Sequence, residues 1–160
     1  MSPLRRAALW LGARPWLSRL APVIVATDRA VDRATHGRFA LLSATGLPSL
    51  TLTVVGRRSG APRSVPLLGV PHAGGWVVVG TNWGTETVPA WVLNLRAAGG
   101  GVVRVRGIET PVTAREARGA EREARWQDLL AVYPNFARYA ARTRRELPVL
   151  VLTPTAVGHP

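Results

Sequence analysis

The sequence predicts one α+β domain, built on an antiparallel sheet or a small barrel. Strand-like apolar runs are grouped in the middle of the 160-residue chain, and segments with helical spacing lie towards its two ends. Turns rich in glycine and proline separate neighbouring strands in the manner of hairpins. A hydrophobic content of 47% excludes a disordered chain, and the length is sufficient for one sizeable core.

Residues 1–48 are predicted to form an N-terminal helical arm, and residues 49–160 the main domain. Apolar residues of the arm recur at helical spacing, interrupted by two prolines. The apolar residues are Leu4, Ala8, Leu11, Leu17, Leu20, Ala21 and Ile24, and the prolines are Pro15 and Pro22. No apolar stretch approaches the roughly 20 residues of a membrane span. Arg14 and Arg19 also argue against a cleaved signal peptide.

The arm is basic and carries Trp10 and Trp16, a combination that suits the surface of an anionic membrane. One expectation is therefore peripheral lipid contact through this segment. The alternative, a helix that packs on its own domain, explains the same residues.

The most informative stretch is Leu50–Val70, which reads as two strands joined by a basic turn. Leu50, Leu52 and Val54 alternate with threonines, as in a half-buried strand. A second apolar run follows the turn. Two glycines and a proline within residues 56–63 favour a hairpin loop, because glycine allows positive φ and proline fixes its own.

This turn is a candidate anion-binding loop. Arg57, Arg58 and Arg63 offer planar sets of donors that suit phosphate or carboxylate. Backbone N–H groups beside the glycines add further donors. The alternative is a solvated basic turn that binds nothing, since charged residues are common at hairpin tips.

The remaining elements follow in order along the chain. They are a turn at 71–75, a buried strand at 76–80, a polar loop at 81–84, a helix from Pro89 to the glycines at 99–101, a hairpin of strands at 103–105 and 108–114, helices at 119–133 and 136–143, and a last strand at 149–152. Thr87 is the expected cap of the first of these helices, in which Trp91, Asn94 and Leu95 share one face.

Composition excludes several classes of chemistry. The net charge of +12 rests on 21 basic residues, and all of them are arginine. Without lysine or cysteine there is no lysine base, thiol nucleophile or thiolate metal site, and His36, His72 and His159 lack metal-ligand spacing. The charge suits an acidic partner. Motifs of nucleic-acid-binding domains, P-loops and Rossmann folds are missing, so no nucleic-acid partner is expected.

Four motifs stand in the same order and at the same spacing as in a known family. They are GRRSGAPRSVPLL, VVVGTN, PAWVLNLR and LAVYPNFARYAARTRRELPVLVL. From Leu50 to Thr153 the chain resembles the deazaflavin-dependent nitroreductases of actinobacteria, also described as deazaflavin-dependent quinone reductases. The resemblance implies a split β-barrel over residues 49–160, like that of flavin-mononucleotide-binding proteins.

The resemblance also implies binding of the reduced 8-hydroxy-5-deazaflavin coenzyme (coenzyme F-420), in preference to FMN. This hydride donor carries a phosphodiester and a polyglutamate tail, so a basic cleft suits it. The implied coenzyme contacts come from the hairpin, the strand after it, a strand end and a helix. They are Arg57, Arg58, Ser59, Arg63, Ser64, Val65, Pro66, Leu67, Leu68, Val79, Gly80, Thr81, Asn82, Ala90, Trp91, Val92, Leu93 and Asn94.

On the acceptor side, the resemblance implies a site formed by Thr81, Tyr133, Phe136 and Tyr139, with Tyr133 or Tyr139 as a catalytic proton donor. The implied function is hydride transfer to a quinone or a nitro-type electrophile. A non-catalytic protein that holds deazaflavin, flavin or haem is the alternative. Phe136 and Trp83 depart from the family pattern and leave the choice of acceptor open. We expect a cytoplasmic enzyme, peripheral on the inner face of the cell membrane if the arm binds lipid.

Overall fold

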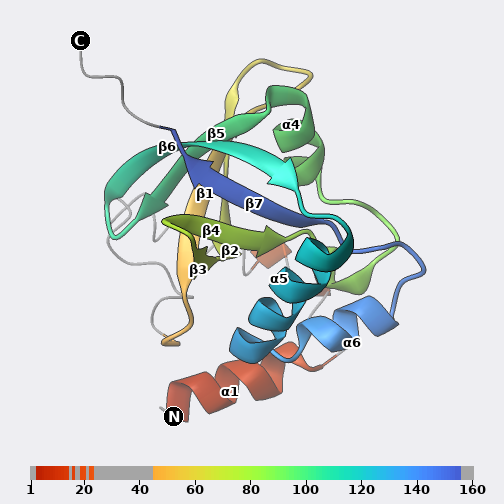
Figure 1. Cartoon of the computed structure of the whole chain (residues 1–160). Helices are drawn as coiled ribbons and strands as arrows, with labels where there is room; N and C mark the ends of the chain where they lie inside the picture. Colours follow the sequence, from red (N-terminus) through yellow and green to blue (C-terminus); the bar gives the residue numbers. More distant parts are fainter. Residues whose placement is uncertain (1–2, 15, 17–18, 21, 24–44, 156–160) are drawn as a thin grey trace.

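The computed structural model describes residues 3–14, 16, 19–20, 22–23 and 45–155. Its centre is one 7-stranded antiparallel sheet with the order β2-β1-β5-β6-β7-β4-β3 (Figure 1). The strands are β1 (Ser49–Val55), β2 (Pro62–Leu68), β3 (Val70–His72), β4 (Gly75–Val79), β5 (Gly100–Val105), β6 (Ile108–Glu116) and β7 (Val149–Pro154).

The sheet curls into a split barrel because its two edge strands are one stretch of chain. Gly69 alone separates β2 from β3, so that β2 pairs with β1 on one side and β3 pairs with β4 on the other. Glycine suits this corner because a β-carbon would lie 2.3 Å from Leu50 Cδ2. The predicted α+β class and split barrel are confirmed.

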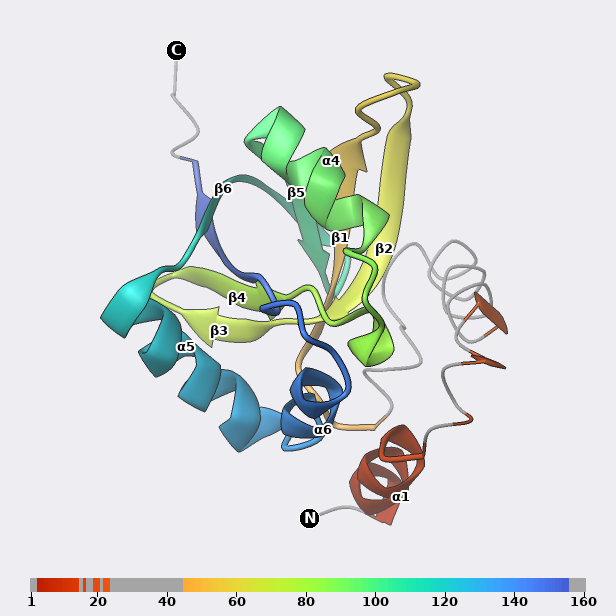
Figure 2. The same ribbon diagram turned by 90° about the vertical axis from the view of Figure 1, so that its right-hand side faces the viewer.

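Helices lie at opposite ends of this sheet (Figure 2). One end carries α4 (Ala90–Ala98), and the other carries α5 (Gly119–Val132), α6 (Phe136–Ala141) and α1 (Pro3–Gly12). The short turn η1 (Asn82–Gly84) follows β4. Asn135 Nδ2 donates to the carbonyl of Leu9 at 2.5 Å, and the Arg142 guanidinium donates to that of Ala13 at 3.1 Å. These bonds attach α1 beside α6.

Two hydrophobic clusters form the core. The cluster beneath α4 contains Leu50, Leu52, Val54, Val78, Val92, Leu95, Val103, Val112, Leu150 and Leu152. The cluster beneath α5 and α6 contains Leu47, Val70, Val77, Val79, Ala117, Leu129, Tyr133, Phe136, Tyr139, Leu147, Val149 and Val151. Alternate residues of β4 and β7 enter different clusters, which is the two-residue period of a strand buried on both faces.

Several boundaries differ from the predicted ones. The prediction that Thr87 caps α4 is wrong, because Pro89 occupies the N-cap position and its carbonyl accepts from the amide of Val92. The turn predicted at 71–75 contains the last two residues of β3, and the chain reverses at Ala73 and Gly74.

The glycines at 99–101 divide their roles. Gly99 ends α4 in the left-handed conformation, with φ 73°, while Gly100 and Gly101 begin β5. Leu17, Ala21 and Ile24 of the predicted arm lie outside the described residues. In the parts of the chain that the structure describes, no helix has the length and apolar character needed to cross a membrane.

Candidate functional site

The β1–β2 turn is closed by its own backbone and presents its charges outward. The amide of Gly56 donates to the carbonyl of Ala61, and the amide of Gly60 donates to the carbonyl of Gly56, both at 2.8 Å. Ser59 Oγ accepts from the amide of Ala61 at 3.3 Å. Gly60 holds a φ of 68°, which a glycine adopts without cost. The predicted hairpin is therefore a closed loop with its own internal hydrogen bonds.

The three predicted anion ligands of this loop are accessible. Arg57, Arg58 and Arg63 are all exposed, and none of them forms a salt bridge within the described ranges. Their positive charges are thus uncompensated by this chain's own described carboxylates. A polyanion would find free donors here.

Asn94 fixes the first of these arginines. Its Oδ1 accepts both the backbone N–H of Arg57, at 3.2 Å, and a guanidinium N–H of the same residue, at 2.9 Å. Asn94 is 7% exposed, so its amide oxygen depends on these donors. One side chain on α4 therefore joins the helix to the hairpin tip across 37 residues of sequence.

The predicted contacts of β2 lie along the edge of the sheet. Arg63 and Ser64 are exposed, and Ser64 Oγ is 2.8 Å from Thr53 Oγ1. Residues 65–68 are half-buried. Val65 and Leu67 pack on the cluster beneath α4, opposite Leu52 and Leu50 in the register. This segment thus offers an apolar surface beside the arginines.

In α4, the predicted residues divide between the surface and the core. Ala90 is exposed, Trp91 and Leu93 are half-buried, and Val92 is fully buried beside the sheet. Trp91 and Asn94 lie on the same side of the helix as predicted, and Trp91 packs on the cluster beneath α4. Val92 lies in the cluster beneath α4, where it packs the helix against the sheet.

The end of β4 meets α4 at close range. A β-carbon on Gly80 would lie 2.7 Å from Val92 Cγ2 and 2.9 Å from Pro148 Cγ, so only glycine allows this approach. Asn82 Nδ2 donates to the carbonyl of Thr87 at 3.0 Å, just before the helix. The hairpin, α4 and the strand end, predicted separately, are thus joined by direct contacts.

The loop after β4 has an unusual backbone. Asn82, Trp83 and Gly84 have φ values of 42°, 57° and 76°, three successive residues in the left-handed region. This conformation is strained for a bulky residue such as tryptophan. Trp83 lies edge-on to Tyr139 with ring centroids 6.0 Å apart.

Sequence reasoning missed Arg145, which stands directly behind this loop. Its guanidinium donates to the carbonyls of Gly80, Thr81 and Thr85, at 3.1, 2.7 and 2.8 Å. Burial lowers the pKa of Arg145, and the Glu86 carboxylate opposes that shift. Arg145 is one of four arginines in residues 138–145, and the sequence carries no signal that separates it from the others.

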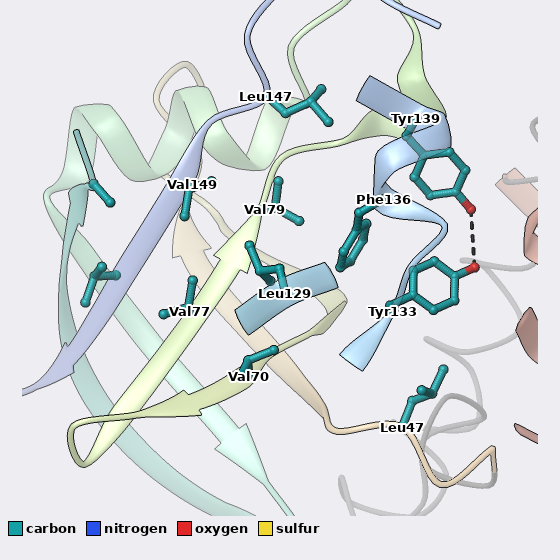
Figure 3. Close-up of a cluster of buried hydrophobic side chains, with 12 residues drawn as sticks. Leu47, Val70, Val77, Val79, Leu129, Tyr133, Phe136, Tyr139, Leu147 and Val149 are labelled. Atoms are coloured by element: carbon teal, nitrogen blue, oxygen red, sulfur yellow. Dashed lines mark hydrogen bonds between the residues drawn. The ribbon is translucent and has the colours of Figure 1, made fainter. Parts of the chain in front are cut away.

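Three of the four predicted acceptor residues, Tyr133, Phe136 and Tyr139, form an aromatic cluster between α5 and α6 (Figure 3). Thr81, the fourth, lies outside this cluster in the loop after β4. Tyr133 and Tyr139 are 7% and 3% exposed, and their hydroxyls lie 3.3 Å apart. Phe136 lies edge-on to Tyr133 with centroids 5.0 Å apart. Burial, and secondarily the neighbouring Tyr133, raises the pKa of Tyr139 far above its ordinary value. The Tyr139 hydroxyl is therefore kept neutral, and the two hydroxyls are directed at each other.

A separate cavity of about 340 Å³ lies between α4, β6 and the start of α5, and none of the predicted site residues lines it. Its lining includes Arg96 and Arg118, which both pair with Glu116, and Arg115, which pairs with Glu121. These ion pairs compensate the positive charge of that cavity. The uncompensated arginines of the hairpin make a better anion site.

The family model of the F420H(2)-dependent quinone reductases matches residues 22–154. The chain belongs to this family. It is 30% identical over 142 residues to an F420H(2)-dependent quinone reductase of Mycobacterium tuberculosis, a match that covers 86% of this chain and 95% of the relative.

Solved structures agree with this membership. A structure described as an F420-H2-dependent reductase (FDR-A) has 34% identity and a TM-score of 0.61, and the match covers 66% of this chain and 93% of that one. The haem storage protein HutZ of Vibrio cholerae has a TM-score of 0.52 at 10% identity, covering 67% of this chain and 81% of that one. The second similarity shows the split-barrel fold alone. Members of this family are oxidoreductases. Reduced coenzyme F-420 is their hydride donor, and a quinone is the acceptor.

Proposed function

We propose that this chain transfers a hydride from reduced coenzyme F-420 to a quinone, with the coenzyme held between the hairpin, α4 and the end of β4. The observation that carries the proposal is the pair of hydrogen bonds between Asn94 and Arg57. They hold the exposed arginines of the hairpin next to the half-buried apolar side chains of α4 and β2. A planar ring with a polyanionic tail requires both surfaces next to each other.

Each segment has a separate part in this arrangement. Arg57, Arg58 and Arg63 hold the phosphodiester and the glutamate tail through charge-assisted hydrogen bonds. Half-buried side chains of β2 and α4 hold the ring, and they exclude water from its reactive face. When bound, the coenzyme supplies the hydride, and this chain supplies placement.

The remaining predicted contacts form the rim of the same site. Ser59, Ser64 and Thr81 offer hydroxyls, and Asn82 an amide, at the hairpin and the strand end. Thr81 is half-buried, so its hydroxyl suits the boundary between coenzyme and acceptor.

For the proton that accompanies reduction of a quinone oxygen, we propose Tyr133 or Tyr139. Support comes from the contact of Tyr139 with Trp83, which places the aromatic cluster next to the loop after β4. The Tyr139 hydroxyl is protonated at neutral pH and can offer its O–H as a hydrogen-bond donor to an acceptor oxygen. Its raised pKa opposes transfer of the proton itself, so a catalytic donor role requires the acceptor site to lower that pKa. Opening of the bond between the two hydroxyls would have to precede contact with an acceptor.

The test is oxidation of reduced coenzyme F-420 by menadione, followed by coenzyme absorbance. We expect turnover that saturates in both reactants, whereas the variant with Arg57, Arg58 and Arg63 all changed to glutamine should lose affinity for the coenzyme. Turnover at the protein-free rate with every quinone tried would contradict the proposed function. A nitroaromatic acceptor assayed in parallel decides whether nitro compounds are also reduced.

We also propose that α1 places the enzyme at a membrane surface, where quinones reside. Leu4 and Trp10 of this helix are 60% and 59% exposed, and Trp16 beyond it is 49% exposed. The guanidinium of Arg14 lies 4.3 Å from the centroid of the Trp10 ring. Exposed apolar and cationic side chains in one short helix and the residues just after it suit the headgroup region of an anionic bilayer.

A further inference from the structure

One side chain from a distant part of the sequence, that of Arg145, bonds the loop between β4 and α4 at three points. Arg145 donates from Nε to Thr85 and from its two terminal nitrogens to Gly80 and Thr81. All three acceptors are backbone carbonyls of one loop. A planar guanidinium can bond three carbonyls in fixed relative positions, which a lysine ammonium cannot reproduce.

This bonding coincides with the strained part of the backbone. The left-handed residues Asn82, Trp83 and Gly84 lie between the carbonyls that Arg145 binds. A strained backbone persists only where its surroundings fix it. Further bonds support the same loop, since the amide of Gly80 donates to Pro148 at 2.9 Å and the amide of Arg144 donates to Glu86 at 2.9 Å.

We infer that Arg145 is a positioning residue for the coenzyme site, acting through the backbone of residues 80–85. This inference rests on the proposed function, because that loop includes the predicted coenzyme contacts Gly80, Thr81 and Asn82. The guanidinium fixes where the Thr81 hydroxyl and the Asn82 amide stand. Without it, both would have to be ordered when the coenzyme binds, at a cost in affinity.

The first measurement needs no coenzyme. Amide hydrogen exchange of the ligand-free protein reports on Gly80, Gly84 and Thr85, whose amides bond within the loop or to Pro148. We expect Arg145→Gln to exchange at least about tenfold faster in peptides that cover residues 80–86, while Arg144→Gln matches the wild type. Arg144 is the matched control because only its backbone amide contributes to the loop.

The second measurement is a fluorescence titration with coenzyme F-420. Arg145→Gln should weaken binding about tenfold, Arg145→Lys should weaken it less, and Arg144→Gln should not change it. In turnover, the KM for the coenzyme should rise in Arg145→Gln and match the wild type in Arg144→Gln. If Arg145→Gln does not fold, as judged by circular dichroism, Arg145→Lys takes its place in both measurements.

Each outcome separates the inference from the function on which it rests. Unchanged amide hydrogen exchange in Arg145→Gln would show that Arg145 does not stabilise the backbone of this loop. Faster exchange with unchanged coenzyme affinity would overturn the positioning of the coenzyme site. If the wild type bound no coenzyme, the proposed function would fail, the positioning role would fall with it, and the exchange data would still decide the contact itself.

Discussion

Asn94 is the residue on which the proposed anion site depends most directly. Its spacing from Trp91 predicts a shared helical face, and the structure agrees. The sequence could not reveal its partner, because Arg57 is 37 residues away and the hairpin brings it near only after folding. The same limit hid Arg145, whose acceptors are 60 to 65 residues distant.

Asn94→Ala should weaken coenzyme binding about tenfold, because Arg57 loses the acceptor that orders it. The informative comparison is a double-mutant cycle measured by titration. Combined with Arg57→Gln, Asn94→Ala should cost less than it does alone, since Arg57→Gln already removes the guanidinium bond and leaves only the backbone N–H bond to Asn94. Combined with Arg63→Gln, its effect should add in full. Additivity in both cycles would show that Asn94 does not act through Arg57.

The tyrosines make a prediction about turnover. If Tyr133 or Tyr139 donates the proton, its phenylalanine variant should lower kcat about 100-fold while the affinity for coenzyme stays the same. Stopped-flow mixing of the preformed coenzyme complex with menadione measures this step. Full activity in both variants would limit the pair to packing.

Tyr139 also makes the stability of the protein dependent on pH. Its pKa is raised in the folded state, so folding favours the neutral phenol, and that contribution is complete below the ordinary tyrosine pKa of about 10. Above it, the unfolded chain releases the proton, and the free energy of unfolding should fall by up to about 1.4 kcal/mol per pH unit. Urea denaturation between pH 8 and pH 11 should show a shallower decline for Tyr139→Phe.

Among the elements, the hairpin and the helices were the most predictable. The alternation in β1 and the helical spacing in α5 are local sequence patterns. Both elements formed where those patterns predicted, because their apolar faces pack into the core. The break between β2 and β3 was not predicted, because the apolar run after the basic turn continues past Gly69 to Val70, and the next turn was expected at residues 71–75. In the structure, Gly69 is the bend between β2 and β3, and the chain reverses four residues later, at Ala73 and Gly74.

That bend is testable through its steric partner. Gly69→Ala should lower the free energy of unfolding by about 1–3 kcal/mol, because the new methyl group meets the Leu50 side chain. Leu50→Ala alone should cost about 2–5 kcal/mol by leaving a cavity. The double variant should lose at least about 1 kcal/mol less than the sum, as measured by urea denaturation. Strict additivity would place the cost of alanine elsewhere, for example in the backbone.

At the scale of the whole molecule, charge and fold class were both accessible from composition and pattern. A net charge of +12 built on arginine indicates an acidic partner. It does not indicate where that partner binds, because some arginines end in ion pairs, as at Glu116, and others do not. Only the folded chain separates the two groups.

The arm provides a whole-molecule prediction. Deleting the residues before Phe39 should abolish pelleting with anionic vesicles of phosphatidylglycerol and spare oxidation of reduced coenzyme F-420 by menadione. Vesicles of phosphatidylcholine are the control for charge. Equal pelleting of the full chain and the truncated chain would remove the arm from membrane contact.

The continuity of β2 and β3 bears on how copies of this chain can associate. An open sheet offers its outer backbone groups to any passing strand, and such growth leads to aggregates. Here the two edge strands, β2 and β3, are consecutive parts of one segment. In addition, β2 contains Pro62, Arg63 and Pro66, and proline and charged residues on an edge strand disfavour the addition of another strand. Lateral recruitment of a foreign strand is thereby discouraged, and self-association has to proceed through side-chain surfaces or by exchange of a whole segment.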